Sequence, residues 1–583
     1  MQSLRILRPL RTSFKLPFTP TNSLQRAAFT STTANMAKEF KLKDVTSLNL
    51  RNGEKKEVEV EGVEGGKVLL LKIQDQVHAT SSNCTHYGAP LVKGILTPEG
   101  RLTCPWHGAC FKVSTGDVED APALDPISKY EVFEKDGGVY IRTDEDTLKA
   151  NRRRLNIKCS SVSDDKVLVI GGGSGTVGAI EGLRGGGYTG QITVISKEGY
   201  QPIDRTKLSK ALLADLSKAA WRSKDYYKDA SIDIIEDEAE SVNFSGKKVS
   251  TKSGKTYDYS KLILATGGTP NQLPLDGLKG DLGNVFLLRT LADTQNIVKA
   301  VGDNGKKIAV IGSSFIGMEV GNCLASMKND VTIIGMEEEP MERVMGKKVG
   351  KVFRGLLEKN GVKFRMGASV EKGTASSSDP SKVGAVQLKD GTSIEADLVI
   401  EGVGVKPATQ FLKDNSSVTL EKDGSLKVDE SFAVKGLQDV YAIGDIATYP
   451  YHGPGGNGSP VRIEHWNVAQ NAGRSVANRI NAPGAPAKPF IPVFWSALGS
   501  QLRYCGNTMN GYDDVVIQGR TEDPAFVAYY TKEETVVAVA SMGKDPYVAQ
   551  CIELMRRNRM PSKSELQKGV DVLDIGLPNE VKM

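Results

Sequence analysis

The sequence predicts a multidomain protein with a small all-β domain at its N-terminus, two doubly wound α/β domains and a C-terminal α+β domain. Short segments that alternate apolar and polar residues, separated by Gly turns, run through residues 39–145 and indicate the β domain. Strand and helix patterns alternate after them, which is typical of parallel sheets. Two strand–glycine–helix openings lie about 140 residues apart and indicate a duplicated nucleotide-binding unit.

These patterns also predict where the domains begin and end. A polar, basic stretch after the β domain has the composition of a linker. The second α/β domain is expected to interrupt the first, which is then built from two separate parts of the chain. The expected boundaries are 1–36 for a targeting segment, 39–147 for the all-β domain, 148–164 for the linker, 165–300 and 403–483 for the first α/β domain, 301–402 for the second, 484–560 for the C-terminal domain and 561–583 for a tail.

Composition places the chain among ordinary globular proteins. Of its 583 residues, 39% are hydrophobic and 25% are charged, which is usual for a soluble protein. No apolar run approaches the roughly 18 residues that a membrane-spanning helix needs, so no transmembrane segment is expected. Of the seven Cys, Cys159, Cys323, Cys505 and Cys551 are scattered and suggest no disulfide framework, which fits a reducing compartment.

The net charge of +5 arises entirely in the first 36 residues. This segment has no Asp or Glu, and without its basic residues the Lys and Arg of the chain equal the 70 Asp and Glu. The overall charge therefore gives no reason to expect nucleic-acid binding. An acid-free segment rich in Arg, Ser and Thr is typical of a mitochondrial transit peptide, so a mitochondrial protein is expected. A plain tail is the alternative, and a second start at Met36 would give a cytoplasmic form. The basic residues are Arg5, Arg8, Arg11, Lys15 and Arg26.

Two short motifs supply the most distinctive side chains of the β domain. Cys84-Thr85-His86 is followed, after seventeen residues, by Cys104-Pro105-Trp106-His107. Two thiolates and two imidazoles at these spacings are the ligand set of a Rieske [2Fe–2S] centre, in which two His replace two Cys on one iron. A structural zinc site is the alternative, although zinc sites favour other spacings. The expected cluster ligands are Cys84, His86, Cys104 and His107.

The first glycine-rich turn follows the apolar strand 167–170. Gly171 and Gly173 match the first two glycines of a dinucleotide-binding fingerprint, and the helix after them would present its N-terminus to a pyrophosphate. The third glycine position holds Thr176, which departs from the pattern. Glu198, which follows the next strand, is the expected partner of the ribose hydroxyls. A second frame, two residues later, would use Gly173, Gly175 and Gly178 but leaves two extra residues after the strand, so the first frame is preferred.

The second turn repeats this pattern. Gly312 ends a strand and Gly317 takes the third glycine position, whereas Ser314 stands at the middle one. The next strand ends at Gly335, where a ribose-binding carboxylate usually lies, and Glu337 begins a run of three carboxylates just beyond it. Negative charge here would repel a ribose 2′-phosphate, which favours NADH over NADPH.

Three further segments strengthen the prediction of nucleotide sites. Ala265, Thr266 and Gly267 form a strand-to-turn junction that a nucleotide could approach closely. Asp445 lies at the end of the strand in VYAIGD, where its carboxylate could bind a polyol. Aromatic residues in RIEHW and FWS could line a flavin ring, although each one alone would more often be a core residue. These aromatic candidates are His465, Trp466 and Trp495.

From about residue 165 to 545 the chain resembles the FAD- and NAD(P)H-dependent ferredoxin reductases that include the apoptosis-inducing factors. These proteins belong to the pyridine nucleotide-disulfide oxidoreductase superfamily. With the Rieske-type domain in front, nearly the whole chain is similar to the Rieske-bearing apoptosis-inducing-factor-like proteins. The motifs that carry the resemblance are GGGSGT, DRTKLSK, ATGGTP, GSSFIGMEV, VYAIGD, RIEHWNVA and FWS.

The resemblance implies FAD in the first α/β domain, NAD(P)H in the second and a reductase domain at the C-terminus. It also implies catalytic roles for Lys210, which would lie near flavin N5, and for Glu319 and Trp466. Without the motif, Lys210 would be read as a surface charge on a helix. The implied positions are Arg205 and Lys210 on the FAD, Asp445 at its ribityl chain, Glu319 and Glu464 at the nicotinamide, and Trp466 and Trp495 beside the isoalloxazine ring.

Together the motifs predict an electron relay in which NAD(P)H reduces FAD and the flavin passes single electrons to the cluster. The final acceptor and the oligomeric state are not identified. A disulfide reductase is a poor alternative, because residues 160–322 contain no Cys. Two other functions stay open: a signalling protein in which NADH-bound flavin sets a partner-binding conformation, and a reductase partner of a monooxygenase. The basic segment RRNRMPSKSE near the C-terminus is expected to be a solvated surface.

Overall fold

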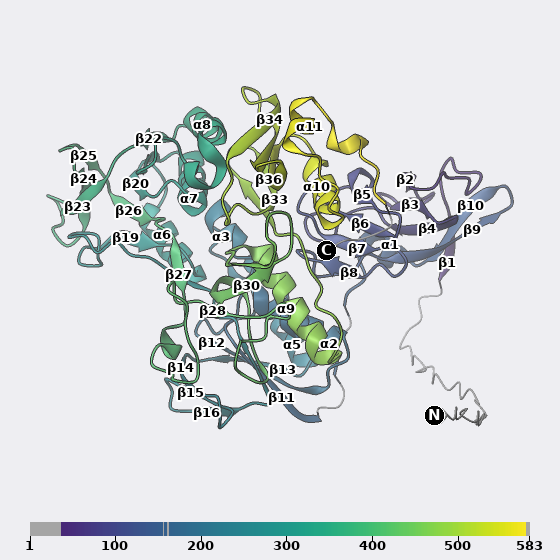
Figure 1. Cartoon of the computed structure of the whole chain (residues 1–583), viewed down its shortest axis with the longest axis horizontal. Coiled ribbons are helices and arrows are strands. Elements are labelled where there is room, and N and C mark those ends of the chain that lie inside the picture. The colour runs from purple at the N-terminus through teal and green to yellow at the C-terminus, as the bar shows by residue number, and fades with distance from the viewer. Residues whose placement is uncertain (1–36, 156, 160–162, 579–583) are drawn as a thin grey trace, which may run out of the picture.

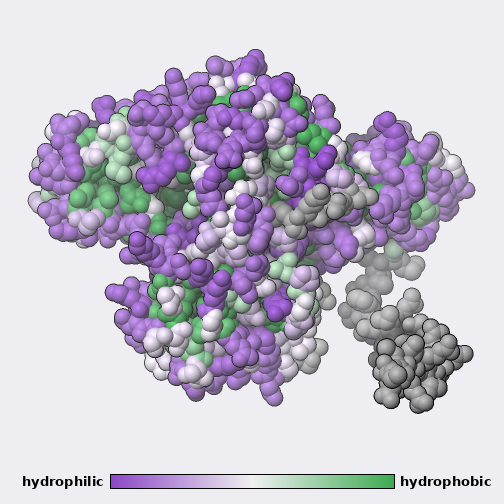
Figure 2. All heavy atoms as spheres, viewed as in Figure 1, coloured by the Kyte–Doolittle hydropathy of each residue, from purple (hydrophilic) through white to green (hydrophobic). Residues whose placement is uncertain are grey.

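The computed structural model of the protein describes residues 37–155, 157–159 and 163–578. The expected targeting segment 1–36 lies outside these residues. Figure 1 shows an all-β lobe (purple to blue) at one side of a larger body, with the yellow C-terminal helices next to it. Hydrophilic residues cover most of the face in Figure 2, and apolar residues appear in patches. No helix in the described part of the chain is long and apolar enough to cross a membrane.

The N-terminal domain is built mainly from antiparallel strands. These are β1 (Lys38–Lys41), β2 (Lys55–Glu59), β3 (Lys67–Ile73), β4 (Gln76–Ser81), β5 (Ile95–Leu96), β6 (Arg101–Thr103), β7 (Cys110–Lys112), β8 (Val118–Asp120), β9 (Lys129–Lys135) and β10 (Gly138–Thr143), with the 3-10 turn η1 (Leu91–Lys93) and the helix α1 (Glu145–Ala150). The larger sheet has the order β1-β10-β9-β4-β3-β2 and the smaller one the order β5-β6-β7-β8. Val68 and Leu70 of β3 face one core, and Leu69 and Leu71 face a second core that contains Cys84. Because successive side chains of a strand point to opposite faces, a strand between two cores is apolar throughout.

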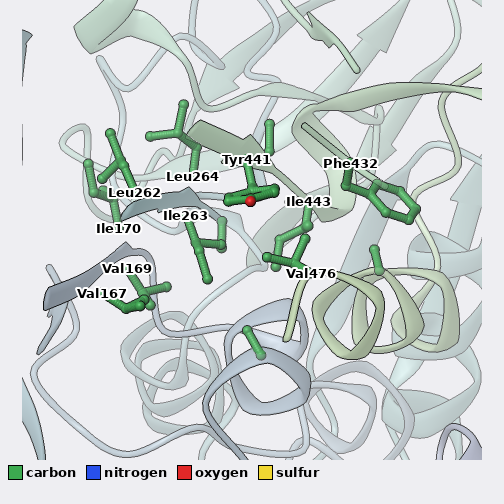
Figure 3. Packing of buried hydrophobic residues seen from close by; sticks show 14 of the residues in the cluster. Val167, Val169, Ile170, Leu262, Ile263, Leu264, Phe432, Tyr441, Ile443 and Val476 are labelled. Atoms are coloured by element: carbon green, nitrogen blue, oxygen red, sulfur yellow. The ribbon is translucent and has the colours of Figure 1, made fainter. Parts of the chain in front are cut away.

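The first α/β domain has a five-stranded parallel sheet with the order β13-β12-β11-β17-β29. Its strands are β11 (Ser163–Ile170), β12 (Gly190–Ser196), β13 (Ile232–Glu236), β17 (Lys261–Leu264) and β29 (Val440–Ala442), and its two long helices are α2 (Ser174–Gly185) and α9 (Trp466–Asn481). Figure 3 shows buried side chains of β11, β17 and β29 together with Val476 of α9. Strands that are buried on both faces explain the continuous apolar runs in the sequence.

Smaller elements surround this sheet. They are α3 (Thr206–Ala211), α4 (Leu216–Ala219), α5 (Lys224–Asp229), β14 (Ala239–Asn243), β15 (Lys248–Thr251), β16 (Thr256–Asp258), β18 (Gly268–Pro270), β27 (Val405–Pro407), η2 (Gln410–Leu412), β28 (Leu426–Lys427), η3 (Gly444–Ile446), β30 (Ala447–Tyr451) and β31 (Ser459–Val461).

The second α/β domain repeats the parallel design with the strand order β19-β26-β20-β21-β22. Its strands are β19 (Val285–Leu287), β20 (Lys307–Ile311), β21 (Asp330–Ile334), β22 (Lys363–Arg365) and β26 (Leu398–Glu401). A separate three-stranded antiparallel sheet packs against it, and its Val386 and Leu388 share a core with Ala309 and Val399 of the parallel sheet. The remaining elements are α6 (Leu291–Val301), α7 (Phe315–Ser326), α8 (Glu342–Lys359), β23 (Val370–Ala375), β24 (Val383–Leu388) and β25 (Ser393–Glu395).

The C-terminal domain is an antiparallel sheet with the order β32-β33-β36-β35-β34. Its elements are β32 (Val493–Ala497), β33 (Gln501–Gly506), β34 (Asp514–Arg520), β35 (Ala525–Lys532), β36 (Thr535–Met542), α10 (Tyr547–Arg556), α11 (Lys563–Gln567) and η4 (Val572–Asp574). Phe526 and Ala540 on one face share a core with the second α/β domain, while Tyr529 and Val539 on the other face pack with α10. The predicted fold class is confirmed.

One expectation about the C-terminal segment is wrong for Arg557, although Asn558, Arg559, Ser564 and Glu565 are exposed as expected. RRNRMPSKSE was expected to be a solvated surface, but Arg557 in it has no exposed surface. Its guanidinium pairs with Glu553 at 2.7 Å and with Glu99 of the N-terminal domain. Sequence alone favours solvated arginines, because arginines are rarely buried unless paired, and Glu99 is 458 positions away in the chain.

Candidate cluster and flavin site

Two loops of the N-terminal domain bring the four expected cluster ligands together. Cys84 and His86 follow β4, and Cys104 and His107 follow β6; all four are buried. The two thiols interact with each other, and the Nδ1 atoms of the two imidazoles lie 3.1 Å apart. In the described part of the chain, no three His, Cys, Asp or Glu side chains are arranged to hold a single metal ion. The donors instead form a Cys pair and a His pair, which is the division that a Rieske cluster requires.

The two ligand loops are the same tight turn. The N–H of Cys84 donates to the carbonyl of Ala89, and the N–H of Cys104 donates to the carbonyl of Ala109, both at 2.8 Å. Gly88 and Gly108 take left-handed conformations in these turns, with φ of 78° and 70°. Each turn therefore presents its Cys and His side chains toward the other.

The electrostatics of these side chains suit metal binding. Burial lowers the pKa of His86 to about 3 and holds the pKa of His107 well below its ordinary value, so both imidazoles are neutral at physiological pH. Burial and the neighbouring Cys104 raise the pKa of Cys84. Two buried thiols of this kind ionise together only when a cation compensates their charge. The residues present therefore fit a [2Fe–2S] cluster.

The first glycine turn opens into a cavity of about 430 Å³. Gly171 has a φ of 111°, and a Cβ there would stand 2.2 Å from the carbonyl oxygen of Ala265. Thr176 does not line the cavity; its hydroxyl is buried and donates to the carbonyl of Gly171 at 2.6 Å. Thr176 thus departs from the glycine pattern but stabilises the turn with a hydrogen bond inside it. The expected residues that line the cavity are Gly171, Gly173, Glu198, Arg205, Ala265, Thr266, Gly267 and Asp445.

Two ion pairs line this cavity. Glu198 is paired with Arg205, and Asp445 is paired with Arg289 at 2.8 Å. Burial opposes the ionisation of Glu198, but Arg205 and Tyr200 outweigh it and lower its pKa. Both carboxylates are therefore oriented and ready to accept hydrogen bonds from ligand hydroxyls. Sequence reasoning expected Glu198 and Arg205 separately and did not anticipate that they bind each other.

A second cavity of about 180 Å³ adjoins the first, and Arg205 and Asp445 line both. Lys210 lines it as well and is not a solvated surface charge: its ammonium lies 2.9 Å from Glu319. The hydroxyls of Ser209 and Ser496 donate to the same carboxylate. The expected residues around this cavity are Lys210, Glu319, Glu464, His465, Trp466 and Trp495.

Within the part of the chain that the structure describes, two buried polar atoms at this cavity lack a hydrogen-bond partner. They are Nδ1 of His465 and Nε1 of Trp466, and burial lowers the pKa of His465 to about 4. Buried polar groups are nearly always hydrogen-bonded, so these atoms indicate a polar ligand in the cavity. The nitrogen and carbonyl groups of a flavin ring would supply the missing partners, and the site therefore fits FAD.

The second glycine turn lies away from both cavities. A Cβ on Gly312 would stand 2.3 Å from the carbonyl oxygen of Gly402, and a Cβ on Gly317 would stand 2.0 Å from that of Gly312. Neither glycine lines the cavities, and neither does Glu337, which pairs with Arg343 at 3.5 Å. The helix that follows this turn, α7, does line the second cavity through Phe315, Ile316 and Glu319.

Aromatic rings connect the flavin cavity to the cluster loops. The ring of Trp495 lies 5.5 Å from that of His86 and 4.7 Å from that of His107, between centroids. A second contact runs from Trp466 to Trp221 at 6.2 Å and from Trp221 to His86 at 5.8 Å. Trp495 therefore touches both candidate cofactor sites.

Sequence reasoning missed four residues here. Trp221 and Tyr87 lie beside His86, Asp204 binds the Tyr87 hydroxyl, and Arg289 pairs with Asp445. Trp221 left one usable signal: the chain has only four Trp, and the other three all lie in the motifs of the two sites.

Fold and site together define a flavin- and nicotinamide-dependent oxidoreductase that carries its own iron–sulfur domain. The chain belongs to the pyridine nucleotide-disulphide oxidoreductase family, whose model matches residues 165–473. A Rieske [2Fe-2S] domain model matches residues 40–131, and a reductase C-terminal model matches residues 493–572.

Individual proteins agree with this assignment. The chain is 37% identical to apoptosis-inducing factor 3 of Homo sapiens over 527 residues, which cover 89% of this chain and 84% of the relative. It is 30% identical to the chloroplastic/mitochondrial monodehydroascorbate reductase of Arabidopsis thaliana, covering 73% and 90% of the two chains. A chain in the structure of the covalent putidaredoxin reductase–putidaredoxin complex matches with a TM-score of 0.64 and 28% identity, covering 69% and 95%. The predicted family, reaction class and cofactors are confirmed, whereas the NADH preference stays a prediction.

Proposed function

We propose that this chain passes electrons from NAD(P)H through FAD to its own Rieske cluster, and from there to an acceptor outside the chain. The observation that carries the proposal is the position of Trp495. Its ring lines the cavity that fits the flavin and lies against both candidate histidine ligands. Electron transfer slows steeply with distance, so this contact would connect the two cofactors without a separate ferredoxin.

The residues of the chain would bind and orient the cofactors. When bound, FAD would accept hydride from NAD(P)H and the cluster would accept single electrons. The N-terminus of α2 presents backbone N–H groups that suit a pyrophosphate. Glu319 holds the ammonium of Lys210 at the second cavity, and Trp466 and Trp495 form part of the wall of that cavity, where they would pack beside a bound flavin ring.

Replacing Trp495 by Leu tests the proposal on the full chain loaded with FAD and cluster. We expect cluster reduction by NADH to lag behind flavin reduction several-fold more than in the unmodified protein, because the ring between the two sites is gone. Stopped-flow absorbance follows the flavin, and EPR of rapidly frozen samples follows the cluster.

Trp106→Leu is the matched control. Trp106 also lies beside His107, at 6.3 Å between ring centroids, but does not line the cavity, so its loss should not increase the lag. A cluster that stays oxidised in the unmodified protein after NADH has reduced the flavin would contradict the proposal. A long-lived complex of reduced flavin with NAD, beside an oxidised cluster, would favour the signalling alternative.

Two finer points belong to the proposal. Glu337 and the two carboxylates after it favour NADH over NADPH, although each is paired with a cation and the preference is therefore expected to be moderate; the ratio of kcat/KM for the two donors measures it. The composition of residues 1–36 favours a mitochondrial location. Imaging of a fluorescent fusion with and without this segment checks that location.

A further inference from the structure

The reductase domains cover one of the two cluster loops. Trp495 lies against the ring of His107, and a Cβ on Gly108 would stand 3.0 Å from Ile552 and 3.2 Å from Val493 of the C-terminal domain. None of the residues from Cys104 to Cys110 is exposed. An acceptor from outside therefore has no access to the cluster from this side.

Buried ion pairs hold the N-terminal domain in this position. Arg222 of the first α/β domain pairs with Asp125 at 2.9 Å and with Glu181 at 3.0 Å. Glu553 of α10 accepts a hydrogen bond from Thr103 at 2.7 Å and lies 3.4 Å from Arg101. Separating the domains would leave buried charges unpaired, which is strongly unfavourable. The acceptor must therefore come to the docked domain.

The other cluster loop has an open face. Tyr87 and Gly88 are exposed, and they directly follow the ligand His86. The ring of Tyr87 stacks on that of His86 with centroids 3.8 Å apart and planes 15° apart, and 37% of the residue remains exposed. Trp221 lies beside Tyr87 with its ring nearly parallel, at 6.5 Å. Tyr87 thus joins a buried cluster ligand to the surface.

Around this face, the cationic side chains are partly exposed and the carboxylates that pair with them are buried. The ammonium of Lys207 lies 5.6 Å from the Tyr87 ring, and its side chain is 37% exposed. Arg152, with its side chain 45% exposed, pairs with Asp125, whose carbonyl accepts a hydrogen bond from Thr85 of the ligand loop. The partner carboxylates Asp204 and Asp125 are buried. A docking molecule therefore meets positive charge and flat aromatic rings.

We propose that electrons leave the cluster through Tyr87 to an acidic one-electron carrier protein that docks on Tyr87, Trp221, Lys207 and Arg152, here called the exit surface. The inference rests on the proposed function and names the kind of partner it requires. One NAD(P)H supplies two electrons, so two carriers gain one electron each, and NAD(P)⁺ and one proton are released. Opposite charges steer such partners together and make association depend on salt.

Two haem proteins of opposite charge serve as probes: cytochrome b5, which is acidic, and cytochrome c, which is basic. A zero-length carbodiimide joins amines to carboxylates that are already in contact. With the full holoprotein we expect a cross-linked peptide that joins Lys207 to cytochrome b5 at low salt, and none at high salt. Cross-links that form only through lysines elsewhere would overturn the proposal.

The rate at which electrons leave the cluster gives a second test of the exit surface. The double variant Lys207→Gln and Arg152→Gln should slow NADH-driven reduction of cytochrome b5 by about threefold to tenfold at low salt. It should not slow that of cytochrome c. Lys248→Gln is the matched control, because Lys248 forms a comparable exposed ion pair, with Asp258 at 3.1 Å, away from the cluster loops. Equal slowing by the control, or no slowing by the double variant, would overturn the proposal.

Variants of Tyr87 separate the ring from its hydroxyl. Tyr87→Phe keeps the stacked ring and loses the hydrogen bond to Asp204, so exit should remain fast. Tyr87→Leu removes the ring and should slow exit several-fold, with the EPR signal of the reduced cluster as the check that the centre is intact. Equal rates of cytochrome b5 reduction for Tyr87→Phe and Tyr87→Leu would contradict electron exit through the ring.

Failure of the exit surface can be told apart from failure of the relay. If NADH does not reduce the cluster, the proposed function fails. The cluster can then be reduced with dithionite, freed of excess reductant and mixed with oxidised cytochrome b5. Exit that still depends on Tyr87 and Lys207 would support the exit surface, and exit that does not would overturn it.

Discussion

Glu401 ends β26 as a buried carboxylate beside the second glycine turn. One of its oxygens accepts a hydrogen bond from the N–H of Leu273 at 2.9 Å, and its other oxygen has no hydrogen-bond partner among the described residues. Burial outweighs this single hydrogen bond and raises the pKa of Glu401 to about 7. Folding therefore favours the protonated form of this side chain.

This carboxylate should make stability depend on pH. Between its ordinary pKa of 4.5 and the raised value of about 7, the folded chain keeps a proton that the unfolded chain has released. The free energy of unfolding therefore falls as pH rises through this window, by about 1–3 kcal/mol, and the loss is complete above it. The melting temperature of Glu401→Gln minus that of the parent should be larger at about pH 8 than at about pH 5.

Glu395→Gln is the control, because Glu395 is an exposed carboxylate of the neighbouring strand β25. Its difference from the parent should be the same at both pH values. The expectation for Glu401 is wrong if the melting temperature of Glu401→Gln also differs from that of the parent by the same amount at both pH values.

At the scale of single residues, sequence reasoning predicts chemistry that is encoded in local spacing. Cys84 and His86 could be recognised because ligand type and separation define a cluster loop. Tyr87 could not, and Trp221 left only the rarity of Trp as a signal, because neither belongs to a motif that predicts a redox role and their stacking joins segments far apart in the chain. Contacts of this kind exist only after the domains have packed.

At the scale of elements, the packing of α2 against α9 positions part of the first cavity, which Gly175 of α2 and Ala469 of α9 line. A Cβ on Gly178 of α2 would stand 2.2 Å from the carbonyl oxygen of Gln470 of α9, and a Cβ on Gly473 would stand 2.1 Å from that of Gly175. The two helices therefore touch backbone to backbone. Glycines at these positions leave room for that contact.

Gly178→Ala should force the two helices apart. We expect a loss of about 1–3 kcal/mol in stability, as for other overpacked sites, and a lower FAD content of the purified protein. Gly355→Ala on α8 is the control, since a Cβ there meets nothing within 4 Å; Ala should stabilise that helix by about 0.5–1 kcal/mol. Thermal melting and the ratio of FAD to protein measure both, and equal behaviour of the two variants would contradict the packing argument.

The sequence left two frames for the first glycine turn, and the geometry draws on both. Gly171 makes the close approach to Ala265 that the first frame assigns to it, while Gly178, from the second frame, makes the close contact between helices. Thr176 replaces the third glycine without a clash and bonds to Gly171. The third glycine of the fingerprint describes close packing of the helix on a strand. The fingerprint could not show that Gly178 is needed as well, because the tight contact of Gly178 is made to another helix.

At the scale of the whole molecule, domain type and order could be predicted but domain contact could not. Strand periodicity and glycine turns depend on local sequence, and they gave the β domain, the two parallel sheets and the order of the domains. The docking of the N-terminal domain depends on charges from remote segments. Thr103 and Glu553, for example, are 450 positions apart in the chain. Buried charges of this kind look like surface residues in a sequence, since charged residues are rarely buried unless paired.

Glu553 is the centre of that contact, so its charge should control both stability and docking. Its carboxylate is fully buried and meets Arg101, Arg556 and Arg557. Glu553→Gln keeps the shape but leaves these cations under-compensated, which should cost about 3–5 kcal/mol. We expect a lower melting temperature and faster hydrogen exchange in β6–β8. Glu59→Gln, which breaks the exposed pair with Lys43 at 3.1 Å, should cost less than about 1 kcal/mol. If exchange in β6–β8 stays slow in Glu553→Gln, the N-terminal domain is held by other contacts and the ion pairs are not what keeps it docked.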